Sequence, residues 1–137
     1  MAGIDYNKLY KLQDKVLAIV FETEFFFYLT CGTCLSRFYI EKRYSDDLDL
    51  FANNESRFNL AVKNVKTVLL KKFSINTEVD GRDFIRLKIN DLLQVDIVND
   101  RVFYYGEPIV QKNGLIIDNI ENILSNKITA IISRDHP

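Results

Sequence analysis

The chain has 137 residues, of which 47% are hydrophobic and 27% are charged, a composition typical of a globular domain with one core. Its 18 lysine and arginine residues nearly balance its 19 aspartate and glutamate residues, which excludes a bulk cationic field for nucleic acid or membranes. Two cysteines are too few for a disulfide framework, and no apolar run is long enough to span a bilayer. We therefore expect a single domain over residues 1–137, located in the cytoplasm and without a membrane partner.

Hydrophobic periodicity predicts the elements of the N-terminal half. An amphipathic helix is expected over residues 5–23, followed by a buried, aromatic-rich strand at Phe25–Thr30. A glycine turn then leads into a short helix around residues 34–39. Period-two alternation predicts a second strand over Tyr44–Phe51, and a long helix should follow from Phe58 to Phe73.

The C-terminal half is predicted to be mostly a group of antiparallel strands. Strands at Ile75–Val79 and Phe84–Asn90 flank Asp80-Gly81, a dipeptide that suits the positive φ angles of a tight hairpin turn. A third strand is expected over residues 92–98, and a capping box from Asp118 to Glu121 predicts a final helix. The order of elements predicts an α/β or α+β fold with a mixed, mostly antiparallel sheet flanked by helices.

Three aspartates occur at strand positions that a core would not favour. Asp47 and Asp49 are two residues apart, so their side chains should leave the same face of a strand, about 7 Å apart at the backbone. Burying two unpaired anions is costly, and an all-oxygen ligand set favours Mg²⁺ or Mn²⁺ between them. Asp96 supplies a third carboxylate within an apolar run. Three carboxylates around two metal ions would serve in-line nucleotidyl transfer, whereas a solvated strand face is the simpler interpretation of Asp47 and Asp49 taken alone.

The segment Thr30–Cys34 joins the first strand to the short helix. The backbone N–H groups after Gly32 and the Thr33 hydroxyl would suit the phosphates of a nucleotide. The same C-x-x-C spacing is also found in thiol redox sites and in half of a zinc site. Zinc would need two further ligands and only His136 is available, while a thioredoxin-like site lacks its tryptophan and a well-placed proline. A thiol oxidoreductase remains an alternative.

One segment resembles the signature of the AbiEii/AbiGii toxin-like nucleotidyltransferases, within the DNA polymerase beta-like superfamily. It covers residues 25–51, with the sequence FFFYLTCGTCLSRFYIEKRYSDDLDLF. That signature is a hydrophobic strand, a Gly-Gly or Gly-Ser turn, a helix, an Arg-x-Ser-x-Asp-x-Asp strand and a later third aspartate. The similarity extends over about residues 10–135 and departs from the pattern in two ways. Cys31 stands where the first glycine is usual, and relatives usually continue into a C-terminal helical region that this chain would lack.

The resemblance implies a Mg²⁺-dependent or Mn²⁺-dependent enzyme that moves a nucleoside monophosphate from an NTP to a hydroxyl of RNA, such as tRNA, or of protein. It also implies a type IV toxin with a cognate antitoxin as partner. The positions that match are Asp47, Asp49 and Asp96 as metal-binding and catalytic residues, and Gly32, Thr33, Arg43, Ser45 and Lys127 as nucleotide-binding residues. The alternative is a catalytically weak or inactive module of the same fold that binds nucleotide or an antitoxin. The lysines at 63, 66, 71 and 72 form either a local RNA-facing patch or a solvated helix rim.

Overall fold

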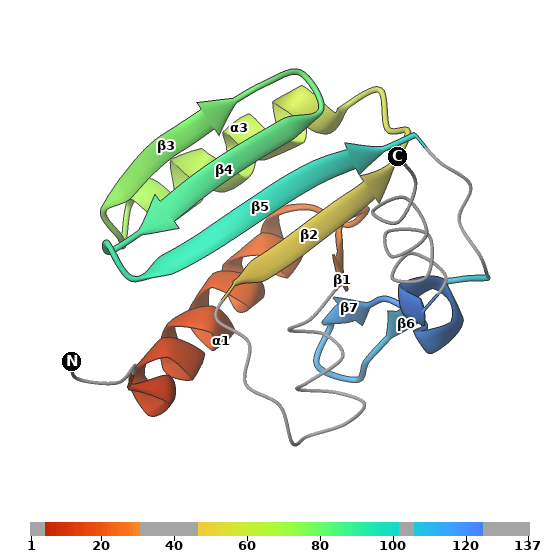
Figure 1. The fold of residues 1–137 in the computed structure, drawn as a ribbon, viewed down its shortest axis with the longest axis horizontal. Coiled ribbons are helices and arrows are strands. Elements are labelled where there is room, and N and C mark those ends of the chain that lie inside the picture. Colours follow the sequence, from red (N-terminus) through yellow and green to blue (C-terminus); the bar gives the residue numbers. More distant parts are fainter. Residues whose placement is uncertain (1–4, 31–46, 102–105, 125–137) are drawn as a thin grey trace, which may run out of the picture.

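Seven strands form one mixed sheet in the computed structural model, which describes residues 5–30, 47–101 and 106–124 (Figure 1). The strands are β1 Tyr28–Thr30, β2 Leu48–Asn53, β3 Ile75–Asp80, β4 Phe84–Ile89, β5 Leu93–Asp100, β6 Ile109–Val110 and β7 Ile116–Ile117. Their order across the sheet is β3-β4-β5-β2-β1-β7-β6. The pairs β2–β5 and β1–β7 are parallel, and the remaining pairs are antiparallel. The expected mixed, mostly antiparallel sheet is confirmed.

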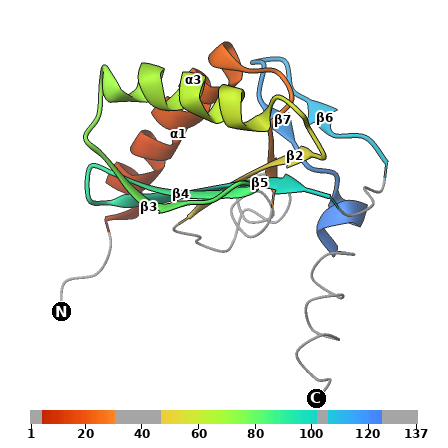
Figure 2. The same ribbon diagram turned by 90° about the horizontal axis from the view of Figure 1, so that it is seen from above.

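Two helices, α1 (Tyr6–Thr23) and α3 (Phe58–Leu70), lie side by side on one face of the sheet (Figure 2). Asp5 caps α1, because its side chain accepts a 3.2 Å hydrogen bond from a backbone N–H of the first turn. The carboxylate of Glu24, which is buried just after α1, accepts a 3.1 Å hydrogen bond from the Asn64 amide of α3. Within the described ranges, no helix combines the length and the apolar character needed to cross a membrane.

The core lies between the helices and the sheet. Alternate residues of β2, β4 and β5 face the helices, and each is at most 3% exposed: Leu48, Leu50 and Ala52 on β2, Ile85, Leu87 and Ile89 on β4, and Leu93, Val95 and Ile97 on β5. Burying a leucine, isoleucine or valine contributes about 1.5–3 kcal/mol, so this face fixes the orientation of each strand. The intervening residues must therefore point to the opposite face of the sheet.

Several element boundaries differ from the predicted ones. The first strand begins at Tyr28 rather than Phe25, α3 ends at Leu70 rather than Phe73, and the short strands β6 and β7 were not predicted. The predicted capping box beginning at Asp118 is wrong. The side chain of Asn119 accepts a 2.8 Å hydrogen bond from the backbone N–H of residue 122, so Asn119 caps the helix that begins at residue 120.

Gly81 is needed for a different reason from the one expected. Among the described residues, it is not one of those with positive φ. Its N–H donates a 2.9 Å hydrogen bond to the carbonyl of Phe84, and a Cβ at position 81 would lie 3.0 Å from that carbonyl oxygen. The β3–β4 hairpin therefore requires glycine for the close approach of two backbone segments.

Candidate active site

A line of polar side chains crosses the sheet on the face opposite the helices. The β1–β2 register places Thr30 beside Asp49, and the β2–β5 register places Asp49 beside Asp96. The β4–β5 register then places Asp96 beside Arg86. Paired residues on neighbouring strands share a face, and the strands lie about 4.8 Å apart. We call Thr30, Asp49, Asp96 and Arg86 the polar row.

Asp47 lies just before β2 and joins the same face. The side-chain amide of Gln94 donates to Asp47 Oδ2 at 3.5 Å and to Asp96 Oδ2 at 3.4 Å. Both hydrogen bonds are long and therefore weak, but they show that the two carboxylates lie on the same side of the sheet. Asp96 is 8% exposed, whereas Asp47 and Asp49 are half-buried. The structure thus brings Asp47, Asp49 and Asp96 to one face.

Arg86 forms a two-pronged ion pair with Asp96. Its Nε lies 2.9 Å from Asp96 Oδ1, and its Nη2 lies 3.1 Å from Asp96 Oδ2. This hydrogen bonding raises the pKa of the Arg86 guanidinium above its usual value, and the charge of Asp96 adds to the effect. The charges of Glu78 and Asp47 raise that pKa further. The polar row therefore contains a cation that holds both oxygens of the third carboxylate.

Arg86 was missed in the sequence. Period-two alternation along Phe84–Ile89 does place position 86 on the face away from the core, as the structure confirms. Alternation does not show which residue of a neighbouring strand lies opposite it. The pairing of Arg86 with Asp96 depends on the register of the β4–β5 hairpin, for which the sequence carries no equally specific signal.

The three carboxylates offer the oxygen donors that a divalent cation prefers, but their side chains are not arranged to hold one. Their oxygen donors suit Mg²⁺ or Mn²⁺. Among the described residues, however, no group of three acidic, histidine or cysteine side chains is arranged to hold a metal ion. Both oxygens of Asp96 hydrogen-bond to Arg86 in this conformation. A shared ion would require Asp96 to exchange Arg86 for the metal.

A further carboxylate borders the polar row at β1. The hydroxyl of Thr30 donates a 2.5 Å hydrogen bond to Asp118 Oδ2. The side-chain amide of Asn122 donates to both oxygens of Asp118, at 3.1 and 2.9 Å. Asp118 is fully buried and follows β7, the strand parallel to β1. Instead of capping a helix, it fixes the hydroxyl of the last described residue before the glycine turn.

The remaining predicted site residues lie outside the described residues. They are Gly32, Thr33, Arg43, Ser45 and Lys127, together with Cys31 and Cys34 of the thiol alternative. Their roles therefore stay predictions. Of the α3 lysines, Lys63 and Lys66 line a groove of about 310 Å³ beside Asp80, which accords with a solvated helix rim.

Comparison with known proteins identifies a fold. No family model and no curated protein matches the sequence. The solved structure of JHP933 from Helicobacter pylori matches with a TM-score of 0.66 at 21% identity, covering 99% of this chain and 61% of that one. A "putative nucleotidyltransferase" from H. pylori matches with a TM-score of 0.67 at 21% identity, covering 98% of this chain and 63% of that one.

A third solved structure, a "putative nucleotidyltransferase" from Thermotoga maritima, matches with a TM-score of 0.63 at 11% identity. The match covers 96% of this chain and 89% of that one. The chain spans about three fifths of each H. pylori protein. At these identities the likeness concerns the fold, and the chain therefore has the mixed α/β fold of solved proteins that bear the nucleotidyltransferase name.

Proposed function

We propose that the protein transfers a nucleoside monophosphate from an NTP to a hydroxyl group and releases pyrophosphate. The observation that carries the proposal is the β2–β5 register, which sets Asp49 beside Asp96 on the face that also holds Asp47. The fold shared with proteins named for this activity supports it. In the reaction, the acceptor oxygen bonds to the α-phosphorus as the bond to the β-phosphate oxygen breaks.

The site residues would have three roles: metal binding, proton transfer and binding of the triphosphate. Asp47, Asp49 and Asp96 would hold Mg²⁺ or Mn²⁺, which supplies electrostatic stabilisation of the transferring phosphoryl group when bound. Asp96 would also take the proton of the attacking hydroxyl. The triphosphate would lie against Gly32, Thr33, Arg43, Ser45 and Lys127, of which the glycine turn offers N–H donors and Arg43 and Lys127 offer positive charge.

The biological setting is also part of the proposal. The acceptor would be RNA, such as tRNA, or protein, and the enzyme would act in the cytoplasm as an AbiEii-like type IV toxin held by a cognate antitoxin. The motif that spans residues 25–51 supports this assignment. Two experiments would test the toxin role. The chain should co-purify with the product of a neighbouring gene, and that product should relieve the growth arrest that the chain causes.

The transfer itself is tested with α-labelled NTPs, Mg²⁺ and total RNA or protein, with pyrophosphate release as a second readout. The wild type should transfer label, whereas Asp47→Asn and Asp49→Asn should not, because each removes a charge while keeping the side-chain shape. Asp83→Asn is a matched control, since Asp83 belongs to an exposed ion pair at the β3–β4 hairpin. Equal transfer by Asp49→Asn and the wild type would rule out the proposed roles.

A binding module without turnover is the second candidate. The Arg86–Asp96 ion pair favours it, because Arg86 already neutralises the carboxylate that a catalytic metal would share. Calorimetry separates the two functions. Mg²⁺-dependent NTP binding without pyrophosphate release, for every NTP and acceptor fraction, would identify the module.

A further inference from the structure

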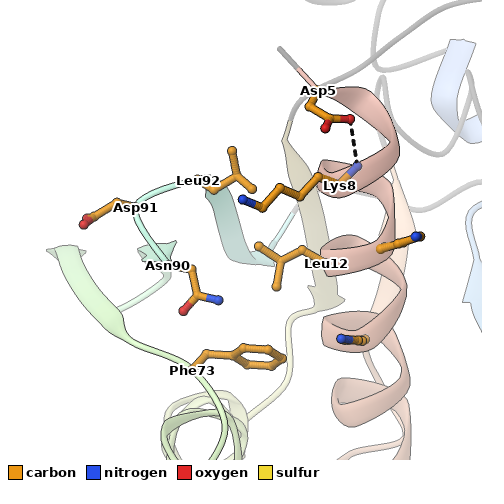
Figure 3. Close-up of a pocket in the computed structure, with 9 residues that line it drawn as sticks. Asp5, Lys8, Leu12, Phe73, Asn90, Asp91 and Leu92 are labelled. Atoms are coloured by element: carbon orange, nitrogen blue, oxygen red, sulfur yellow. Dashed lines mark hydrogen bonds between the residues drawn. The ribbon is translucent and has the colours of Figure 1, made fainter.

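A groove of about 710 Å³ lies between α1 and the β4–β5 turn (Figure 3). Its floor is apolar and is formed by Leu12, Phe73 and Leu92, which pack against or within the core. Leu12 is 8% exposed, whereas Phe73 and Leu92 are half-buried. Figure 3 shows Lys8 and Asn90 extending toward the space in front of this floor. We call this the lysine groove.

Three lysines of α1 line the lysine groove. Lys8, Lys11 and Lys15 are spaced three and four residues apart, so they follow one side of the helix over about 10 Å. Within the described part of the chain, no ion pair or hydrogen bond engages their ammonium groups. Asp5 and Asp91 also line the groove, and the Asp5 carboxylate is occupied in capping α1. The lining therefore carries a local excess of positive charge in a chain whose net charge is −1.

The far wall of the lysine groove is held in place by the β4–β5 turn. The Asn90 N–H donates to the Ser74 carbonyl at 2.8 Å, and the Ser74 N–H donates to Asn90 Oδ1 at 2.9 Å. Asn90 and Asp91 both adopt left-handed backbone conformations, with φ angles of 53° and 52°. The carboxamide oxygen of Asn90 is thus committed to the turn, and its NH₂ group is left to donate to a ligand. Phe73, next to Ser74, is fixed by the same contacts.

The lysine groove adjoins the β4–β5 turn, close in sequence to Gln94, which contacts the acidic site, our name for the carboxylates of Asp47, Asp49 and Asp96. Leu92 of the groove precedes Gln94 by two residues, about 7 Å of extended chain. Gln94 hydrogen-bonds to both Asp47 and Asp96 on the other face. A chain that is bound along α1 and passes around the β4–β5 turn would arrive at the carboxylates.

We propose that the lysine groove binds a single-stranded nucleic acid. One base would stack on Phe73 and accept a hydrogen bond from Asn90, and the three lysines would contact successive phosphates. An aromatic surface beside a line of cations suits a polynucleotide better than an acidic peptide, because every nucleotide carries an aromatic base whereas aspartate and glutamate side chains have no ring to stack. This inference deepens the proposed function, on which it rests for the identity of the acceptor as a polynucleotide.

The test is fluorescence anisotropy with a short labelled oligouridylate and the matching oligothymidylate, in EDTA, so that binding is measured apart from metal and turnover. The wild type should bind with an affinity that falls about fourfold when the salt concentration doubles, because three neutralised phosphates give a logarithmic slope of about −2. Replacing Lys8, Lys11 and Lys15 together by alanine should reduce the slope nearly to zero. Phe73→Leu should weaken binding about fivefold by removing the stacked ring.

Replacing Lys63, Lys66 and Lys72 together by alanine is the matched control, since it removes the same charge from the α3 side. This control should bind within about twofold of the wild type if the contacts are local. The inference is overturned if the wild type does not bind, if both triple variants lose equal affinity, or if polyglutamate competes as well as unlabelled oligonucleotide. Thermal unfolding verifies that each variant is folded. Asp49→Asn should bind normally, so failure of transfer and failure of groove binding are distinguished.

Discussion

Two arginine–aspartate pairs join β4 to β5, or the residues that flank them, and the two pairs differ in what surrounds them. Arg86 pairs with Asp96 in the middle of the two strands, and the side chains are 37% and 11% exposed. Arg101, just after β5, pairs with Asp83, just before β4, with Nη2–Oδ1 at 2.9 Å and exposures of 48% and 37%. The two pairs have the same chemistry and similar length.

The neighbours of each pair indicate its role. The side chains around Arg101 and Asp83 link segments that are far apart in the chain: Arg101 also donates to Asn54 at 2.7 Å, and Asn99 donates to Asp83 at 3.4 Å. That pair belongs to a structural junction. Around Arg86, by contrast, two further carboxylates, those of Asp47 and Asp49, lie on the same face of the sheet. Carboxylates gathered on one face of a sheet are typical of a functional site, so one ion pair belongs to a fold contact and the other to a candidate site.

The largest expected effect is the loss of activity in Asp96→Asn. The substitution retains the shape and one oxygen acceptor for Arg86, but removes the charge and the proton acceptor. Transfer should fall by at least about 100-fold, equivalent to about 2.7 kcal/mol of activation free energy. Label transfer is the measurement, and Asp83→Asn, in the other pair, should retain wild-type activity. Comparable losses in the two variants would show that the two ion pairs do not differ in function.

The largest stability effect should arise beside the Asp83–Arg101 pair, from Asn99→Ala. Asn99 is 5% exposed; its Oδ1 accepts from the Glu55 N–H at 2.8 Å, and its Nδ2 donates to the Glu55 carbonyl at 3.0 Å. Removing both bonds leaves two backbone groups without these partners and should cost about 2 kcal/mol of unfolding free energy. Urea denaturation measures this. Transfer activity of the folded variant should be unchanged, and loss of activity without loss of stability would contradict the structural assignment.

The difference between the two ion pairs was only partly predictable from the sequence. Period-two alternation correctly placed Asp96 opposite Val95 and Ile97, because apolar side chains must face the core. It could not place Asp49 beside Asp96, since alternation fixes the face of a strand and not its neighbour. That information lies in the parallel β2–β5 pairing, a contact between segments far apart in the chain.

The errors at Asp118 and Gly81 have a similar origin. Asp118 and Asn119 have nearly equal preferences for a helix N-cap, so local propensity does not decide between them. The tertiary contact with Thr30 decides, because it holds Asp118 in the interior and leaves Asn119 to cap the helix. For Gly81, the sequence alone does not show whether glycine is needed for a positive φ angle or because a Cβ would not fit. The structure shows the second reason, since a Cβ would lie too close to the Phe84 carbonyl oxygen.

A smaller effect is expected in the thermal midpoint, which Mg²⁺ should change differently in variants of the two ion pairs. Arg86→Met retains an unbranched apolar stem near Phe84, whose ring lies 5.4 Å from the guanidinium carbon, but removes the cation from Asp96. If the acidic site binds Mg²⁺, the metal should raise the thermal midpoint more in Arg86→Met than in the wild type, because Asp96 no longer has to exchange its partner. Arg101→Met is the control, and its response to Mg²⁺ should equal that of the wild type. Equal responses in all three proteins would argue against metal binding at Asp96.

The smallest expected effect is the pH dependence of the Asp83–Arg101 pair. Hydrogen bonding from Arg101 lowers the pKa of Asp83 below its usual 3.8, although partial desolvation opposes the shift. Because the pKa is lower in the folded than in the unfolded chain, the pair stabilises the protein above about pH 4, and this contribution is lost as the pH falls through the depressed pKa. The difference in unfolding free energy between the wild type and Asp83→Asn should therefore be constant near neutral pH and shrink in acid. Both groups are exposed, so high salt should reduce the difference at neutral pH. A difference that grows in acid would show that Asp83 stabilises the junction through its neutral form and not through its charge.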